Sequence, residues 1–190
     1  FMDGINGITA FYALSVLAPL AYLNFSAGEQ FFPQSLLYVV GISVWVFSWF
    51  NARKRARTFA GDVGSVSMAF ILAYLMLQLF LHTGQWAYIL FLSVYGVDAV
   101  LTIMHRLIKR ENIFQAHRSH FYQYLANELA WPHLRVSGLY AILQLLISTL
   151  TIWGLQEGWH PAIFIGLLLG LVVLYVVGKR HMLRGLAATG

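Results

Sequence analysis

The sequence predicts an all-α protein, a polytopic bundle of about six membrane-spanning helices. Of the 190 residues, 59% are hydrophobic and only 10% are charged, with a mean hydropathy of +0.70. Soluble domains carry about 25% charged residues, so this chain cannot cover a surface that faces water. Its apolar residues form runs of about 16–20, the length that crosses a hydrocarbon core of about 30 Å as a helix.

Polar residues divide these runs into six predicted spans within one transmembrane domain, residues 1–190. The spans are Ile8–Leu23, Ser35–Phe50, Ser65–Leu81, Trp86–Met104, Ser137–Trp153 and Ala162–Val177. Alternation of the links then predicts that the loops at about 51–64 and 105–136 share one face of the membrane with both termini.

All twelve basic residues fall on that face: Arg53, Lys54, Arg55, Arg57, Arg106, Lys109, Arg110, Arg118, Arg135, Lys179, Arg180 and Arg184. The positive-inside rule makes it cytoplasmic. The net charge of +5 is therefore explained by the membrane as partner, and no nucleic acid is predicted.

Two glycine-flanked acidic clusters lie on this face. Asp3-Gly4-Ile5-Asn6-Gly7 is typical of a turn. Gly61-Asp62-Val63-Gly64-Ser65 precedes the third span. Asp62 could cap that helix, or it could recruit Mg²⁺ beside backbone N–H groups that attract phosphate. The basic run Arg53–Arg57 concentrates anions nearby and favours the second interpretation.

A third cluster, His117-Arg118-Ser119-His120, lies in the longer loop. It is either a solvated loop segment or a phosphate-binding group of imidazoles and a guanidinium. Zinc is a weaker interpretation, because the chain has no cysteine and no third ligand is close in sequence.

Asp98 lies inside the fourth span, where an uncompensated carboxylate costs at least about 2.5–3.5 kcal/mol. We expect it to face the bundle interior with a partner such as Thr102, one turn further on. A direct role in a site is the alternative.

Together the three clusters resemble the motifs of the polyprenyl-phosphate N-acetylhexosamine-1-phosphate transferases, a family related to phospho-N-acetylmuramoyl-pentapeptide transferase. The matching segments are Met2–Thr9, Phe59–Ser65 and Ala116–Gln123, in the family's order. His117 and His120 are separated by Arg-Ser, as in the branch that begins O-antigen and related surface glycans. The link from Asn51 to Phe59 is about one residue longer than the family pattern.

The resemblance implies a magnesium-dependent enzyme (Mn²⁺ being the alternative ion) of the bacterial inner membrane, with its active face cytoplasmic. It would transfer N-acetylhexosamine-1-phosphate from a UDP-sugar to undecaprenyl or another polyprenyl phosphate and release UMP. Asp62 would bind the metal, Asp3 and Asn6 the nucleoside, and Phe59 the uracil. A homodimer is compatible with this assignment. His117, Arg118 and His120 would hold phosphates, and Asn51 would belong to the substrate site.

The family's paired Asp-Asp motif is absent from these residues, and family members have more spans. The chain is therefore expected to be the C-terminal portion of a longer enzyme and to be inactive alone. A non-catalytic membrane scaffold or a small-molecule transporter is the alternative function, with Asp98 in the transport path. Because transporters place polar groups near the midplane, the concentration of polar motifs at one face favours the enzyme.

Overall fold

The computed structural model describes residues 3–26, 28–112 and 119–189, and all regular structure in these ranges is helical. The elements are α1 (Ile8–Phe25), α2 (Gln34–Asn51), α3 (Gly61–Thr83), the 3₁₀ helix η1 (Trp86–Leu92), α4 (Ser93–Ile108), α5 (Phe121–Asn127), α6 (His133–Gln156) and α7 (Pro161–Thr189). Among the described residues, six segments are long and apolar enough to cross a membrane: α1, α2, α3, η1 with α4, α6, and α7. The predicted polytopic helix bundle is confirmed.

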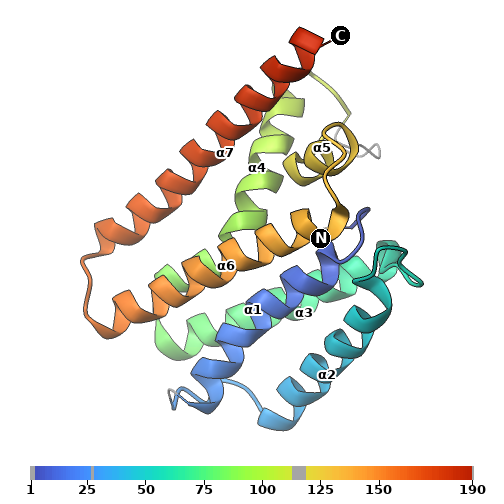
Figure 1. Ribbon diagram of the computed structural model, residues 1–190. Coiled ribbons are helices and arrows are strands. Elements are labelled where there is room, and N and C mark those ends of the chain that lie inside the picture. Colours follow the sequence, from blue (N-terminus) through green and yellow to red (C-terminus); the bar gives the residue numbers. More distant parts are fainter. Residues whose placement is uncertain (1–2, 27, 113–118, 190) are drawn as a thin grey trace.

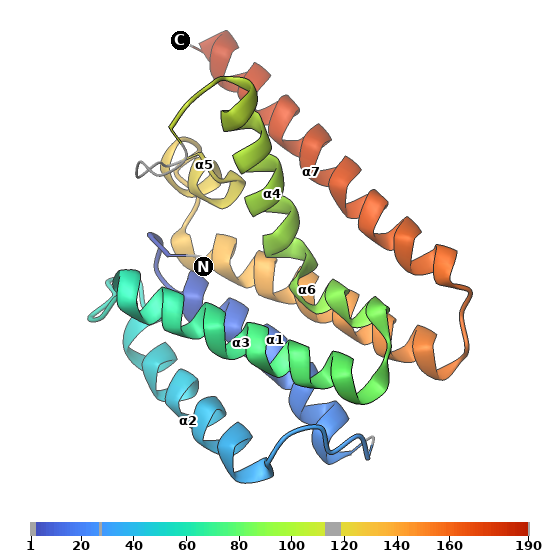
Figure 2. The ribbon, with the colours of Figure 1, turned by 180° about the vertical axis from the view of Figure 1, so that it is seen from behind.

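Helix α1 forms the centre of the bundle and packs on α2, α3 and α6 (Figures 1 and 2). Of its spanning segment 67% is buried inside the protein, against 17% for α2 and for α7. The outer faces of α2 and α7 are nevertheless apolar, with Trp45, Trp49 and Val173 exposed. Such faces are stable where the surrounding medium is hydrocarbon.

Contacts between the links show that consecutive spans run in opposite directions. At one end, Glu29 of the α1–α2 link pairs with His82 of α3 at 3.4 Å. At that same end, the rings of Trp86 and Phe164 meet at 6.2 Å, which joins the start of η1 to the start of α7. The α2–α3 link, α5 and the ends of the chain lie at the opposite end (Figure 1). This end is called the motif end below, because Asp3 and Asp62 lie there.

The sequence predicted one continuous helix for the fourth span, and this prediction is wrong. The span divides between Leu92 and Ser93 into η1 and α4. At this break the Gln144 side chain bonds to two backbone groups of the span. Its Nε2 donates to the Leu90 carbonyl at 2.9 Å, and its Oε1 accepts from the Val94 N–H at 3.1 Å. A side chain inserted between backbone groups four residues apart is a recognised cause of a helix break.

Three further boundaries differ from the prediction. The Gly61–Ser65 segment forms the first turn of α3 instead of preceding it, and the long loop contains the short helix α5. Helix α7 continues past Val177 to Thr189. Long basic side chains such as Lys179 can reach polar groups from within a helix, so they need not end it.

We predict that reporter fusions at Gln30, Gly84 and Gly158 will read as external. These positions lie in the three links opposite the motif end, which carries the basic loops that the positive-inside rule assigns to the cytoplasm. Alkaline phosphatase and green fluorescent protein fusions measure the two sides independently. A fusion at Arg55 is the control and should read as cytoplasmic; a cytoplasmic signal at any of the other three would contradict the topology.

Candidate functional site

The Asp3–Gly7 turn leads directly into α1. Gly7 takes the position before the helix with φ +82°, and its N–H donates to Asn51 Oδ1 at 3.0 Å. A Cβ atom here would lie 3.1 Å from Leu134 Cδ2. The left-handed backbone favours glycine here, and a larger residue would also have to displace the Leu134 side chain of α6.

Two asparagines join this turn to the α2–α3 link. Asn6 Nδ2 donates to the carbonyls of Arg53 and Lys54, each at 3.0 Å. The buried Asn51 donates from Nδ2 to the Thr58 carbonyl at 2.9 Å while its Oδ1 holds Gly7. The Asp3–Gly7 turn and the α2–α3 link thus form one hydrogen-bonded unit, although more than forty residues separate the bonded groups.

Asp3 connects the same unit to α5. Its carbonyl accepts from the Tyr122 hydroxyl at 2.8 Å. Burial, more than the Asp98 carboxylate, raises the pKa of the Tyr122 phenol above its usual value, so the phenol remains a neutral donor. Within the described residues, Asp3 Oδ1 is buried and has no hydrogen-bond partner. A buried oxygen of this kind is suited to a ligand's donor group.

Asp62 is exposed in the first turn of α3, and Ala60 takes the N-cap position. The interpretation of Asp62 as the helix cap is therefore wrong. Its backbone carbonyl accepts from Ser65 Oγ at 3.2 Å. In the described part of the chain its carboxylate forms no hydrogen bond or ion pair, so this negative charge faces outward beside the positive end of a helix.

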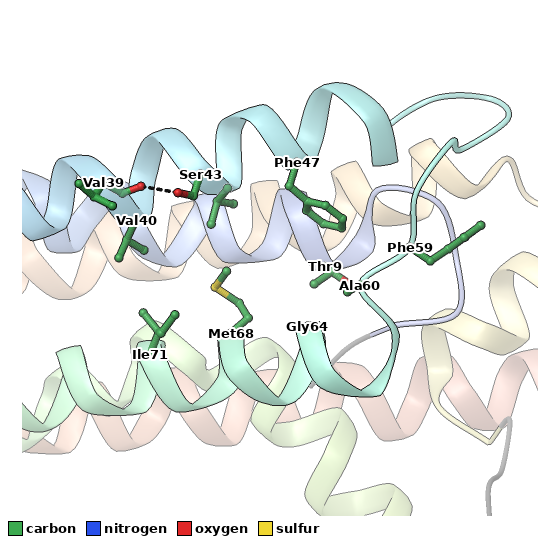
Figure 3. A pocket seen from close by; sticks show the side chains of 11 residues that line it. Thr9, Val39, Val40, Ser43, Phe47, Phe59, Ala60, Gly64, Met68 and Ile71 are labelled. Atoms are coloured by element: carbon green, nitrogen blue, oxygen red, sulfur yellow. Dashed lines mark hydrogen bonds between the residues drawn. The ribbon is translucent and has the colours of Figure 1, made fainter.

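Phe59 lies at the mouth of a groove between α2 and α3, with a volume of about 460 Å³ (Figure 3). The side chain is 57% exposed. Ala60 and Gly64 line the groove near the turn that carries Asp62. Further along the spans its walls are formed by apolar side chains: Val39, Val40, Val44, Phe47, Met68 and Ile71.

Of the histidine cluster, His117 and Arg118 lie outside the described residues. His120 stands immediately before α5, and its N–H donates to Gln123 Oε1 at 3.3 Å. Its ring stacks on Tyr122 with centroids 5.5 Å apart. Among the described residues no three His, Asp, Glu or Cys side chains gather as metal ligands, and the zinc interpretation gains no support.

Asp98 is buried and accepts hydrogen bonds from several helices. Thr102 Oγ1 donates at 3.2 Å, which confirms the predicted partner. The Phe121 N–H donates at 3.1 Å, and His120 Nδ1 lies 3.4 Å away. Two tyrosine hydroxyls complete the set at 3.0 Å each: Tyr140 of α6 and Tyr175 of α7.

Sequence reasoning missed Tyr140, Tyr175 and Lys179. Lys179 Nζ donates to the Tyr175 hydroxyl and to the Ser119 carbonyl, each at 2.9 Å. Tyr175 and Lys179 are four residues apart and therefore share one face of α7. Two polar residues at that spacing, next to an apolar run, could have indicated in the sequence that this face of the last span meets polar partners.

The arrangement described so far defines a class: a multi-pass membrane protein with polar motifs linked together at one end of the bundle. Residues 1–80 match the family model "Glycosyl transferase family 4". The resemblance predicted from the motifs is thereby confirmed over the segment that contains Asp3, Asn6, Asn51, Phe59 and Asp62. Neither the curated proteins nor the solved structures give a match.

This family match carries a general chemical meaning. The family suggests a membrane phospho-sugar transferase; its partners are nucleotide-sugars and lipid phosphates, and it is generally metal-dependent. The match ends before Asp98, His120 and α7.

Proposed function

We propose that this chain forms part of an enzyme that transfers N-acetylhexosamine-1-phosphate from a UDP-sugar to a polyprenyl phosphate such as undecaprenyl phosphate. One observation carries the proposal: motifs from the start of α1, the α2–α3 link and α5 are hydrogen-bonded together at one end of the spans. That placement suits a reaction between a lipid headgroup and a soluble nucleotide. The product would begin a cell-envelope glycan such as O-antigen.

In the proposed reaction an oxygen of the lipid phosphate forms a bond to the β-phosphorus of the UDP-sugar. The bond between that phosphorus and the oxygen bridging to the α-phosphate breaks, and UMP leaves with the electron pair. The lipid then carries a diphospho-sugar. Charge on the transferring phosphoryl group is the main obstacle, so the protein must supply cationic and polar groups around it.

The nucleoside would bind beside Asp3 and Phe59. Asp3 Oδ1 is buried and, among the described residues, without a partner, so it can accept from a base or ribose. The exposed Phe59 ring offers a face for the uracil. Because Asn6 Nδ2 already donates to two carbonyls, its contribution would come through Oδ1 or through the link that it holds. Asn51 would act in the same indirect way.

Asp62 fits a single carboxylate ligand of Mg²⁺, with Mn²⁺ as an alternative. It is exposed and, in the described residues, unpaired. Magnesium is commonly held by one or two carboxylates together with substrate phosphates and water. When bound, the ion would neutralise charge on the diphosphate. His117, Arg118 and His120 would hold phosphate oxygens from the α5 side of the site.

A transporter remains the second candidate, with Asp98 in its path. The bonds from Thr102, Phe121 and two tyrosines engage both carboxylate oxygens, which favours a fixed structural carboxylate. We further propose that the enzyme works at the cytoplasmic face of a bacterial inner membrane, either as a monomer or as a homodimer.

The complete gene product that contains this chain should release UMP from UDP-N-acetylglucosamine or UDP-N-acetylgalactosamine when undecaprenyl phosphate and Mg²⁺ are present. Residues 1–190 expressed alone should not. Omitting the lipid phosphate is the control, because hydrolysis would release nucleotide without it. If the complete product releases no UMP with either donor but moves a solute across vesicles, the transporter is favoured and the enzyme proposal fails.

A further inference from the structure

The helix α7 meets the loop that carries His120 through a buried polar network. Asp98 of α4 is its centre, with 0% of the residue exposed. Tyr175 donates to Asp98 Oδ1 at 3.0 Å, and the Phe121 N–H donates to the same oxygen at 3.1 Å. One carboxylate oxygen therefore ties the first residue of α5 to the final span.

Lys179 closes this network on its outer side. Its ammonium donates to the Tyr175 hydroxyl and to the Ser119 carbonyl, each at 2.9 Å, and lies 5.5 Å from the Tyr124 ring centroid. Lys179 thus contacts residues on both sides of His120. The Thr102 and Tyr175 hydroxyls lie between the Lys179 ammonium and the Asp98 carboxylate and bond to both. The positive charge of Lys179 therefore compensates the buried negative charge of Asp98.

His120 is restrained from several directions by this arrangement. Its Nδ1 lies 3.4 Å from Asp98 Oδ1, its ring stacks on Tyr122, and its N–H bonds Gln123. A carboxylate beside Nδ1 favours the tautomer that carries its proton there, and it sets the direction in which Nε2 points. The orientation of the imidazole thus depends on Asp98, which the α7 side chains hold in turn.

We propose that Asp98, Tyr175 and Lys179 are positioning residues that hold the His120 loop in place. Helix α7, which carries Tyr175 and Lys179, then contributes to the geometry of the site. This inference rests on the proposed function for its catalytic meaning. None of the three residues needs to touch substrate. Their effect is to keep the imidazole and the start of α5 where phosphate would bind, and small displacements of such groups cost large factors in rate.

The test uses Tyr175→Phe and Lys179→Met in the complete gene product, with Arg180→Met as the matched control. Arg180 is the exposed neighbour of Lys179 and takes no part in the network. Hydrogen–deuterium exchange of a peptide covering residues 119–127 should speed up by at least about fivefold in the first two variants and remain unchanged in the control. Turnover (kcat) should fall about 10- to 100-fold, with a smaller change in KM for the UDP-sugar. Lys179→Arg should restore part of both.

Unchanged exchange in residues 119–127 would overturn the positioning role, as would faster exchange with unaltered turnover. The failure of the proposed function looks different: the unmodified protein would then release no UMP at all. Exchange measured without substrate still decides whether α7 holds the loop in that case. Asp98→Asn adds a size-matched variant that removes the charge at the centre, and it should accelerate exchange over the same peptide.

Discussion

Asp62→Asn is expected to abolish turnover in the complete gene product while leaving its thermal stability nearly unchanged. Asn keeps the size of the side chain but removes the charge that would bind Mg²⁺. Loss of a charged ligand at the reacting phosphate is worth several kcal/mol of barrier, and each 1.36 kcal/mol changes the rate about tenfold. We therefore expect a loss of about a thousandfold or more in the rate of UMP release.

The small expected effect on stability follows from the structure. Ala60, and not Asp62, takes the cap position of α3, and the Asp62 carboxylate is exposed. Only its interaction with the helix dipole is lost, which is worth about 0.3–1 kcal/mol. Glu128→Gln is the matched control, since Glu128 is an exposed acidic residue at the motif end. Near-normal turnover of Asp62→Asn at limiting Mg²⁺ would move the metal site elsewhere.

Gln144→Leu is expected to produce the largest loss of stability. It removes the Oε1 atom that accepts from the Tyr12 hydroxyl and from the Val94 N–H, both inside the bundle. An unsatisfied buried donor costs about 1–3 kcal/mol, and hydrogen bonds between membrane helices average about 0.6 kcal/mol. We expect a loss of about 2 kcal/mol, or about 5 °C in Tm in detergent. Gln156→Leu, at the exposed end of the same helix, is the control.

A double variant makes this prediction specific to the hydrogen bond. Tyr12→Phe removes one of the two donors that bond to Gln144 Oε1, while the Val94 N–H remains. Gln144→Leu should therefore cost less in the presence of Tyr12→Phe than it does alone. Strictly additive shifts in Tm would show that packing, and not the bond between the two side chains, determines the stability at the break in the fourth span.

Much of the architecture follows from the sequence alone. The thickness of the bilayer sets the length of each apolar run, so the six spans could be identified without knowing how they pack. The motifs could be recognised because Asp3, Asn6, Asn51, Phe59 and Asp62 lie in short segments of characteristic order, and the family match covers them. These properties are local, and local properties are visible in a sequence.

The tertiary structure decided what depends on which helix faces meet. Asp98 was expected to find Thr102, which lies on its own helix, but its tyrosine partners come from α6 and α7. The break in the fourth span depends on Gln144, fifty residues beyond Val94. A buried polar group must be satisfied by whatever donor or acceptor the packing brings near. Hydropathy locates each span in the membrane but carries no information about its rotation or its neighbours.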